Sequence, residues 1–293
     1  MVPNLSKYEV VEKLNKGWSG DDKYILKDPS GEKYLLRLSP MTRFEQRKGQ
    51  YDLLIRLNPL DIPLPKVIDF GQLDDTQCYL LLTYLEGEEA SDFVQSLSPH
   101  EQYDEGIKLG QVLSKIHQAD TGPVTTPWID IFKRKITRKI ERIEKENIDL
   151  PSKEKIIAYA LTHMDLVAHH PSRIIHGDFH INNMIAHEGK IYVVDLDRIE
   201  LADAHDDFKP FAFNVWVSPY FQTGIIDGYF MNEIPDNFFE ILKLYAVDSL
   251  LAMIPWAITF GEAEVKNAYR LTNDVLKWYN NLELTIPTWY KKP

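Results

Sequence analysis

The stretch RIIHGDFHINNMIAHEGKIYVVDLD, residues 173–197, places polar side chains with affinity for protons or metals between short apolar runs. These side chains are His176, Asp178, His180, Asn183, Asp195 and Asp197. The runs MIAH and KIYVVDLD are joined at Glu188-Gly189, a pair typical of a tight turn, so a hairpin is predicted to follow the polar loop. Such a hairpin returns the chain to the loop and brings the two polar ends of the stretch together.

The residues alone leave three interpretations of this stretch. A metal hydrolase would use Asp178-x-His180, but it would need further Asp, Asn and His blocks downstream, and none resembling them follows DLD. The predicted loop also lacks the helix that aligns histidines at positions i and i+4. A phosphoryl-transfer site needs a carboxylate beside the attacking hydroxyl, plus an amide and a second carboxylate for Mg²⁺. Asp178, Asn183 and Asp195 supply that set, and a polar loop that only satisfies backbone groups is the third interpretation.

Composition narrows the class of protein. The chain has 293 residues, 44% of them hydrophobic, which suits one large domain or two coupled lobes. Its net charge of −11 argues against a nucleic-acid partner, and either accommodates a cationic ligand or only aids solubility. Cys78 is the single cysteine, so an intrachain disulfide and a thiolate zinc site are excluded. Without a signal-peptide pattern or a run like YLLLTYL long enough to span a bilayer, we expect a cytoplasmic protein with no membrane partner.

The first ninety residues are predicted to form a sheet. Runs of aromatic and branched apolar residues, typical of strands, lie at 8–14, 23–27, 33–39, 66–72 and 78–86. The turn signal DPSG joins the second run to the third, and a helical pattern at 43–57 follows the third run, with Phe44, Tyr51, Leu54 and Ile55 near one face. The sequence therefore predicts a five-stranded antiparallel sheet with one helix inserted after the third strand.

Beyond residue 90 the hydrophobic spacing becomes helical. The clearest segments lie at 101–118, 128–147, 238–260 and 262–281. Pro255 is expected to kink or break the third of them. The chain is therefore expected to be of the α+β class, with strands first and helices after them.

Residues 173–197 also resemble a known family. HGDFHINN followed by VVDLD is similar to the catalytic signature of the aminoglycoside phosphotransferase family, His-x-Asp-x4-Asn and then an Asp between apolar residues. NKGWSGDDKYIL, EKYLLRLSP, YLLLTYLEGE, LGQVLSKIH and LADAHDDF resemble other segments of that family, so the likeness covers roughly residues 8–210. It implies a bilobal, protein-kinase-like fold, with an N-terminal lobe at 1–86, a hinge at 83–87 and a larger, mainly helical lobe at 88–293.

The resemblance assigns roles within the motif. Asp178 matches the catalytic base, and Asn183 and Asp195 match ligands of Mg²⁺. Asp197 is expected either to assist a second ion or to form a salt bridge with Arg198 or another basic side chain.

Other residues follow from the motif's surroundings. His176 is expected to fix the loop through hydrogen bonds, and His180 to be structural or to face the substrate. The acidic residues expected either to face a cationic substrate or to serve as caps and surface charges are Asp203, Asp206, Asp207, Asp227 and Glu233. Among these, Asp206 and Asp207 are the substrate-binding candidates.

The nucleotide side departs from the usual family pattern. Arg37 stands where the third strand often carries a phosphate-binding Lys, and it keeps the charge and the bidentate grip. Its acidic partner is expected to be Glu45, although Gln50 is an alternative occupant of the aligned helix position. In GWSG, Ser19 and Gly20 either approach a phosphate or only make a turn.

The hinge resemblance implies that Thr83 to Leu85 offer backbone groups to adenine or guanine, since they lie between the two predicted lobes. We therefore expect an ATP- or GTP-dependent, Mg²⁺-requiring kinase of a small-molecule hydroxyl, monomeric or homodimeric. An aminoglycoside-type antibiotic and a metabolite such as choline, homoserine or a sugar remain open as substrates. A protein kinase is disfavoured because Asp-Leu-Asp replaces Asp-Phe-Gly. A catalytically silent nucleotide-binding module is the alternative outside the enzymes.

Overall fold

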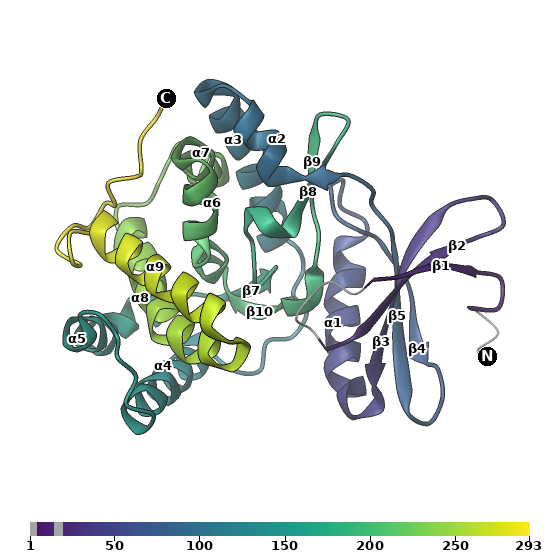
Figure 1. Ribbon diagram of the computed structural model, residues 1–293, viewed down its shortest axis with the longest axis horizontal. Helices are drawn as coiled ribbons and strands as arrows, with labels where there is room; N and C mark the ends of the chain where they lie inside the picture. Colours follow the sequence, from purple (N-terminus) through teal and green to yellow (C-terminus); the bar gives the residue numbers. More distant parts are fainter. Residues whose placement is uncertain (1–4, 15–19) are drawn as a thin grey trace.

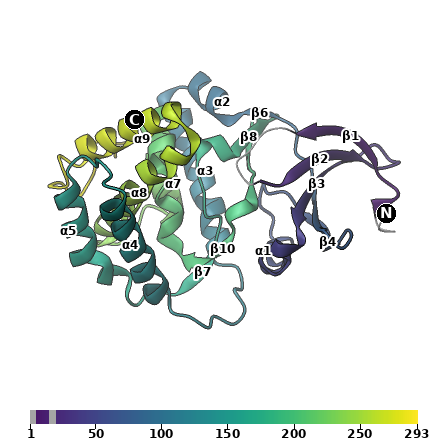
Figure 2. The same ribbon diagram turned by 60° about the horizontal axis from the view of Figure 1, so that its bottom comes forward.

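A β-sheet lobe and a larger helical lobe lie side by side in this computed structural model, which describes residues 5–14 and 20–293. Figure 1 shows the five-stranded sheet with helix α1 at one end of the molecule and helices α3 to α9 at the other. The view in Figure 2 shows the same separation, with β8 and the short strand β6 lying between the two parts. The α+β, bilobal fold class predicted from the sequence is confirmed.

The sheet of the N-terminal lobe is antiparallel throughout, in the order β1-β2-β3-β5-β4. The strands are β1 (Glu9–Leu14), β2 (Asp22–Lys27), β3 (Lys33–Pro40), β4 (Val67–Gln72) and β5 (Gln77–Thr83). The turn between β2 and β3 forms because the Asp28 carboxylate accepts hydrogen bonds from the backbone of Ser30 and Glu32, and Gly31 takes a φ of 98°. This turn fixes a register in which Lys23 lies opposite Arg37.

Helix α1 (Phe44–Leu57) is inserted after β3, as predicted, but the predicted buried face is partly wrong. Leu54 is buried, whereas Ile55 is 40% exposed. The polar side chains of Arg47 and Gln50 are buried on this helix instead. A buried arginine needs charged partners, so this face of α1 indicates a polar contact with another element.

The C-terminal lobe consists of helices around short strand pairs. Its helices are α2 (Ala90–Ser96), α3 (Pro99–His117), α4 (Trp128–Lys145), α5 (Lys153–His163), α6 (Phe211–Val217), α7 (Pro219–Tyr229), α8 (Phe238–Ala257) and α9 (Glu262–Trp278). Its strands are β6 (Glu88–Glu89), β7 (Ser172–Ile175), β8 (Met184–His187), β9 (Lys190–Val193) and β10 (Glu200–Asp203). The predicted hairpin is β8–β9, turned at Glu188 and Gly189, which both have positive φ. Strand β7 pairs with β10, and the loop that follows β7 carries the polar motif.

Helices α3 and α7 cross at backbone contact because glycines line both sides. A Cβ built on Gly106 or Gly110 of α3 would overlap the carbonyl oxygen of Phe221 or Ile225, and Gly228 of α7 meets the backbone of α3 in the same way. Helix α3 begins with a capping box formed by Ser98 and Glu101. It ends at His117, whose side chain contacts Asp207.

Helix α8 is the most apolar element described. By length and composition alone, Phe238–Phe260 would suffice to cross a membrane, but 72% of its apolar 18-residue window is buried inside the fold. This burial is the pattern of a core helix. The helix continues through Pro255 and ends at Ala257, so the proline does not break it.

Candidate active site

The loop after β7 turns sharply at Gly177, just before Asp178. Gly177 has a φ of 81°, a region that side chains rarely occupy. A Cβ at this position would also overlap the carbonyl oxygen of Arg198. Only glycine therefore lets the chain pass Arg198 and present the next residue, Asp178, at the end of the strand.

His176 holds this loop against the segment that follows β9. Its Nε2 lies 3.0 Å from the carbonyl oxygen of Val194, so this nitrogen must carry a hydrogen and donate it. Its Nδ1 accepts from the backbone N–H of Asp178 at 3.3 Å. The ring is buried and both nitrogens are occupied inside the protein, as the structural role predicted from the sequence requires.

Asp178 is an ionised carboxylate held by two neighbours. The Nε2 of His180 lies 3.3 Å from its Oδ1, and Arg198 Nε lies 3.7 Å from its Oδ2. Burial disfavours the charged form, but the hydrogen bond from His180 and the charge of Arg198 outweigh it and hold the pKa of Asp178 well below its usual value. Because the His180 Nδ1 accepts from the Asn182 backbone, its Nε2 is the donor to Asp178. The side chain of Asp178 remains 27% exposed, which leaves it accessible to a further hydrogen-bond donor.

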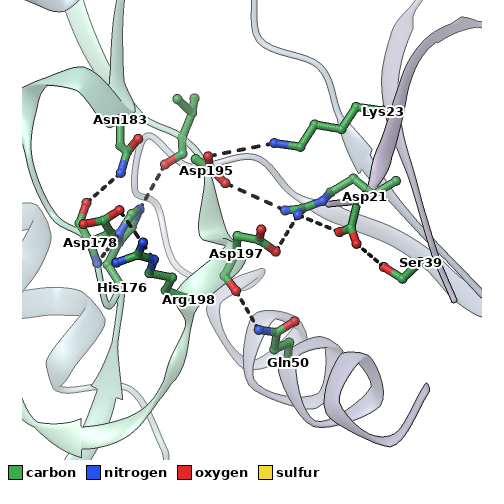
Figure 3. Close-up of polar contacts among 12 residues, drawn as sticks. Asp21, Lys23, Ser39, Gln50, His176, Asp178, Asn183, Asp195, Asp197 and Arg198 are labelled. Carbon is green, nitrogen blue, oxygen red and sulfur yellow. Dashed lines mark hydrogen bonds and ion pairs between the residues drawn. The ribbon is translucent and has the colours of Figure 1, made fainter. Parts of the chain in front are cut away.

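Asn183 and Asp195 lie next to Asp178 in the structure (Figure 3). The amide nitrogen of Asn183 donates to the carbonyl oxygen of Asp178 at 2.9 Å, which leaves its side-chain oxygen without a donor among the described residues. A backbone bond of 2.8 Å from Val194 to the Asn183 carbonyl brings the chain segment before Asp195 to the same loop. Asp195 has a φ of 56°, an uncommon conformation for a residue other than glycine.

Two cations from the sheet face Asp195. Lys23 Nζ and Arg37 Nη1 lie 3.9 Å and 3.8 Å from its two carboxylate oxygens. Both side chains are almost fully buried and project from opposing positions of β2 and β3. Lys23 was not among the predicted site residues, although the register of a hairpin turned at DPSG places residue 23 opposite residue 37. Hairpin register was therefore the signal that would have found it.

Asp21 is the hidden centre of the charged cluster between the lobes. Its fully buried carboxylate accepts from Arg37 at 2.9 Å and from Arg43 at 3.0 Å, and it also pairs with Arg47. Ser39 adds a hydroxyl donor at 2.8 Å. No sequence signal identified Asp21, because its partners come from the strand β3 and the segment that follows it, 16 to 26 positions along the chain.

Asp197 belongs to the same cluster. Its carboxylate pairs with Arg37 and lies 2.6 Å from Arg47 Nη1, while Gln50 donates to its backbone carbonyl at 2.7 Å. Burial opposes its charge, but Arg37 and Arg47 outweigh that effect and lower its pKa to about 2. Of the two roles expected for Asp197, the structure shows the salt bridge, which joins the lobes and has Arg37 and Arg47 as its partners.

The helix partner expected for Arg37 is also corrected. Glu45 is exposed on α1, and the ion pairs described for Arg37 run to Asp21, Asp195 and Asp197. Helix α1 instead contributes Arg47 and Gln50, so the acidic groups come from Asp21, just before β2, and from the segment after β9. The helix therefore contributes a basic side chain to this contact, where an acidic one was expected.

Asp207 does not face a substrate. Its side chain is fully buried and accepts from the backbone N–H groups of His176 and Gly177 at 2.7 and 2.6 Å, and from His117 Nε2 at 2.9 Å. It therefore braces the loop that carries Asp178, and the predicted substrate-binding role is wrong. The other nitrogen of His117 contacts Tyr229 of α7, so the α3–α7 packing supports the same loop.

The substrate-binding role predicted for Asp206 is also wrong. Its side chain is 5% exposed and pairs with Lys209 at 2.7 Å. Burial raises the pKa of Asp206 despite the charge of Lys209, which also approaches Asp248 of α8. Asp227, too, is buried, and it accepts hydrogen bonds from tyrosines of α3 and the C-terminal segment. Of the acidic groups expected to face a cationic substrate, Asp203, Asp206, Asp207 and Asp227 are thus buried inside the C-terminal lobe, whereas Glu233 is exposed.

At the hinge, only some of the backbone groups predicted to contact the nucleotide base are available. The backbone N–H of Thr83 donates to Lys66, and that of Tyr84 donates to Lys33, so neither is free for a base. Leu85, partly buried, is the first residue after β5 whose N–H has no partner among the described residues. Gly20 is described, with a φ of 68° and open space around it, whereas Ser19 lies outside the described residues.

An aromatic pair on α6 adjoins the loop on its other side. The ring of His180 packs against Phe213 with centroids 4.7 Å apart, and Phe213 meets Trp216 edge to face at 5.6 Å. Asp274 and Arg270 of α9 hold the indole through a 2.9 Å hydrogen bond and a cation–π contact. The side chain of His180 is only 10% exposed. Phe213 and Trp216, which were not predicted as site residues, are partly exposed and extend from the loop toward α9.

Comparison with known proteins defines the class. Residues 10–236 match the model of the phosphotransferase enzyme family, APH, and the chain belongs to that family. Its class is therefore that of the phosphotransferases, and its fold is that of the small-molecule kinases. An uncharacterized protein encoded in the ileS 3′ region of Staphylococcus aureus is 30% identical over 92 residues, which span 31% of the chain and 60% of that protein.

Solved structures share the fold at low identity. The aminoglycoside phosphotransferase APH(4)-Ia, in a ternary complex with ADP and hygromycin B, has a TM-score of 0.67 and 17% identity, covering 94% of this chain and 96% of that one. The amicoumacin kinase hAmiN, in complex with AMP-PNP and Ca²⁺, has a TM-score of 0.64 and 13% identity over 97% and 90%. A proposed fructosamine-3-kinase from Haemophilus somnus has a TM-score of 0.61 and 17% identity over 92% of each chain.

Proposed function

We propose that the protein transfers the terminal phosphoryl group of ATP or GTP to a hydroxyl group of a small molecule, with Mg²⁺ as the divalent ion. The observation that carries this proposal is that Asp195, held to the loop of Asp178 and Asn183, faces Lys23 and Arg37 of the other lobe. Phosphoryl transfer relies on positioning and on charge stabilisation, and this arrangement supplies both from two lobes. We also propose that the reaction takes place in the cytoplasm, a reducing compartment in which a protein with one cysteine and no disulfide is expected.

Asp178 is proposed to orient the substrate hydroxyl and to accept its proton. Its carboxylate is ionised and partly exposed, and its position is fixed by His180, by Arg198 and by the brace at Asp207. A carboxylate with a low pKa is a weak base, so its main contribution is to hold the hydroxyl in line for attack. Lys23 and Arg37 are proposed to bind the phosphate oxygens of the nucleotide.

Asn183 and Asp195 fit a hard divalent cation. The amide nitrogen of Asn183 is used in a hydrogen bond, while its side-chain oxygen has no donor among the described residues. The Asp195 carboxylate is 38% exposed. Two protein oxygens, completed by phosphate and water, are a ligand set that Mg²⁺ accepts. When bound, such an ion neutralises charge on the phosphates, and Asp197 is excluded from its ligands because two arginines occupy it.

The substrate class is proposed from the neighbourhood of the loop. Phe213 and Trp216 are placed to contact the part of the substrate that does not react, and aromatic rings favour the apolar faces of sugar rings as well as cations. An aminoglycoside-type antibiotic is therefore the first class to test, in keeping with the hygromycin B complex of APH(4)-Ia. A metabolite such as a sugar, a fructosamine, choline or homoserine is the second class.

The decisive test combines nucleotide binding with the Asp178→Asn variant. We expect ATP or GTP with Mg²⁺ to raise the melting temperature of both proteins, since a ligand that binds only the folded state stabilises it by about 2.7 kcal/mol at 100 times its Kd. Phosphate transfer should be lost only in the variant. If neither purine nucleotide shifts the wild-type melting temperature, the kinase proposal is wrong.

The acceptor is identified by a phosphorylation screen over aminoglycosides, macrolides and small hydroxylated metabolites, with ATP and GTP in parallel. Product mass should rise by one phosphoryl group for the true acceptor and stay unchanged with Asp178→Asn. Nucleotide binding without transfer to any compound would favour a silent nucleotide-binding module. Trp216→Ala should weaken acceptor binding while leaving the nucleotide-induced melting shift unchanged.

A further inference from the structure

Outside the active site, two histidines and one aspartate gather at the far end of the β7–β10 pair. His170 precedes β7, Asp203 is the last residue of β10, and His205 lies in the short 3-10 helix that follows. Asp203 pairs with Ser172 across the two strands, which places it beside the chain segment of His170. Donor atoms of the three residues all lie within 4.8 Å of one another.

The three side chains meet through their metal-binding atoms. His170 Nδ1 lies 2.9 Å from Asp203 Oδ2, and His205 Nδ1 lies 3.0 Å from Asp203 Oδ1. The two imidazole rings are 5.1 Å apart. Two imidazole nitrogens and a carboxylate oxygen are a donor set that suits Zn²⁺, Ni²⁺ and Co²⁺ better than Mg²⁺ or Ca²⁺.

A second layer of contacts fixes the carboxylate. The hydroxyl of Tyr245 donates to Asp203 Oδ2 at 2.7 Å, and the indole N–H of Trp128 donates to the Tyr245 oxygen at 3.0 Å. Both rings are buried, and the His205 ring lies against Phe230 and Phe238. Partners of this kind orient metal ligands and are usually needed for tight binding.

The cluster is open to solvent through its histidines only. The side chain of Asp203 is 2% exposed, whereas those of His170 and His205 are 20% and 19% exposed. An ion can therefore reach the two imidazoles from outside while the carboxylate stays held from within. The cluster is also separate from the active site, because the four residues of β7, about 13 Å of strand, lie between His170 and the loop that begins at His176.

We propose that His170, Asp203 and His205 form a binding site for a divalent transition-metal ion of the Zn²⁺, Co²⁺ and Ni²⁺ group, distinct from the nucleotide-associated ion. Each imidazole would carry a hydrogen on Nε2 and coordinate through Nδ1, so the Nδ1 hydrogen now directed at Asp203 would move to Nε2 in a neutral ring or leave to solvent from a protonated one. Three protein ligands leave a fourth position for water. The ion would tie the segment before β7 to the turn after β10.

The test uses the full chain after treatment with EDTA and removal of the chelator. Zn²⁺, Co²⁺ and Ni²⁺ are added one at a time, with Mg²⁺ for comparison, and binding is followed by calorimetry and by the melting temperature. We expect one equivalent of a transition-metal ion to bind and to raise the melting temperature, and Mg²⁺ to have no such effect. Co²⁺ should also give visible d–d absorption bands, a readout that needs no variant.

His170→Gln and His205→Gln are the informative variants, and His169→Gln is the matched control. His169 is the exposed sequence neighbour of His170 and is not a member of the cluster. Each cluster variant should lower the affinity at least tenfold and abolish the Co²⁺ bands, while the control should bind as the wild type does. Absence of Co²⁺ bands in the wild type, or equal affinity in the cluster variants, overturns the proposal.

Discussion

Asp21 combines complete burial with three arginine partners, an arrangement that is stable only while the charges balance. A buried ion pair that loses one member leaves an uncompensated charge, which costs several kcal/mol. Arg37 and Arg47 also contact Asp197, so Asp21 sets the position of both arginines between the lobes. In the proposed reaction Asp21 would therefore position Arg37 toward the phosphates of the nucleotide.

Asp21→Asn is predicted to lower the free energy of unfolding by about 3 kcal/mol and to raise the KM for nucleotide more than it lowers kcat. Denaturant unfolding and steady-state kinetics measure the two effects. Asp22→Asn is the control, since Asp22 is half exposed and its one ion pair among the described residues is with the equally exposed Lys13, a surface pair that contributes little to stability. Equal effects of the two substitutions would contradict the positioning role of Asp21.

At the scale of elements, the crossing of α3 and α7 connects core packing to the active site. Glycines let the helices touch at the backbone, and from this pair His117, held by Tyr229, extends to Asp207, which holds the backbone of Gly177. A change in helix separation would therefore move the loop that carries Asp178. The same packing explains why a loop residue depends on helices more than about forty residues away in sequence.

Gly110→Ala is predicted to destabilise the protein by about 2–3 kcal/mol, because the added methyl overlaps the Ile225 carbonyl and the helices must separate. The melting temperature measures this effect. Gly49→Ala on α1 meets open space and should instead be neutral or stabilising by up to about 1 kcal/mol through helix propensity. A neutral Gly110→Ala would show that the crossing has room that the structure does not indicate.

At the scale of the whole molecule, the charged cluster is also one of the contacts that join the lobes. Arg37, Arg47 and Gln50 of the N-terminal lobe hold Asp197, two residues beyond Asp195. The lobes are thus linked beside the proposed ion site, and nucleotide phosphates that attract Arg37 would compete with this link. Asp195 and Asp197 therefore have different tasks despite their proximity.

This difference predicts opposite responses to two matched substitutions. Asp195→Asn should raise the Mg²⁺ concentration needed for half-maximal activity at least tenfold while changing the melting temperature little, because the side chain is 38% exposed. Asp197→Asn should lower the melting temperature by several degrees and leave the Mg²⁺ requirement within about twofold, since a lost buried ion pair costs stability. A raised Mg²⁺ requirement in Asp197→Asn would restore Asp197 as a metal ligand.

Local pattern was enough for much of this protein. The five strands, helix α1 and the β8–β9 hairpin follow from alternation, helical spacing and turn residues, which act over a few neighbours. The motif that holds Asp178, Asn183 and Asp195 is likewise contiguous, so spacing indicated that these residues would meet. Lys23 was within reach too, because hairpin register is a local property.

Other features depended on tertiary structure alone. Periodicity reports which face of an element is buried but not what covers it, so α1 was expected to bury Ile55 and instead buries Arg47. The partners of Asp21, and the burial of Asp206 and Asp207, arise where segments distant in sequence pack together. An acidic residue looks the same in the sequence whether its carboxylate faces a substrate or a backbone amide. Only the packed chain decides between those roles, because desolvation and hydrogen-bond partners are properties of the fold.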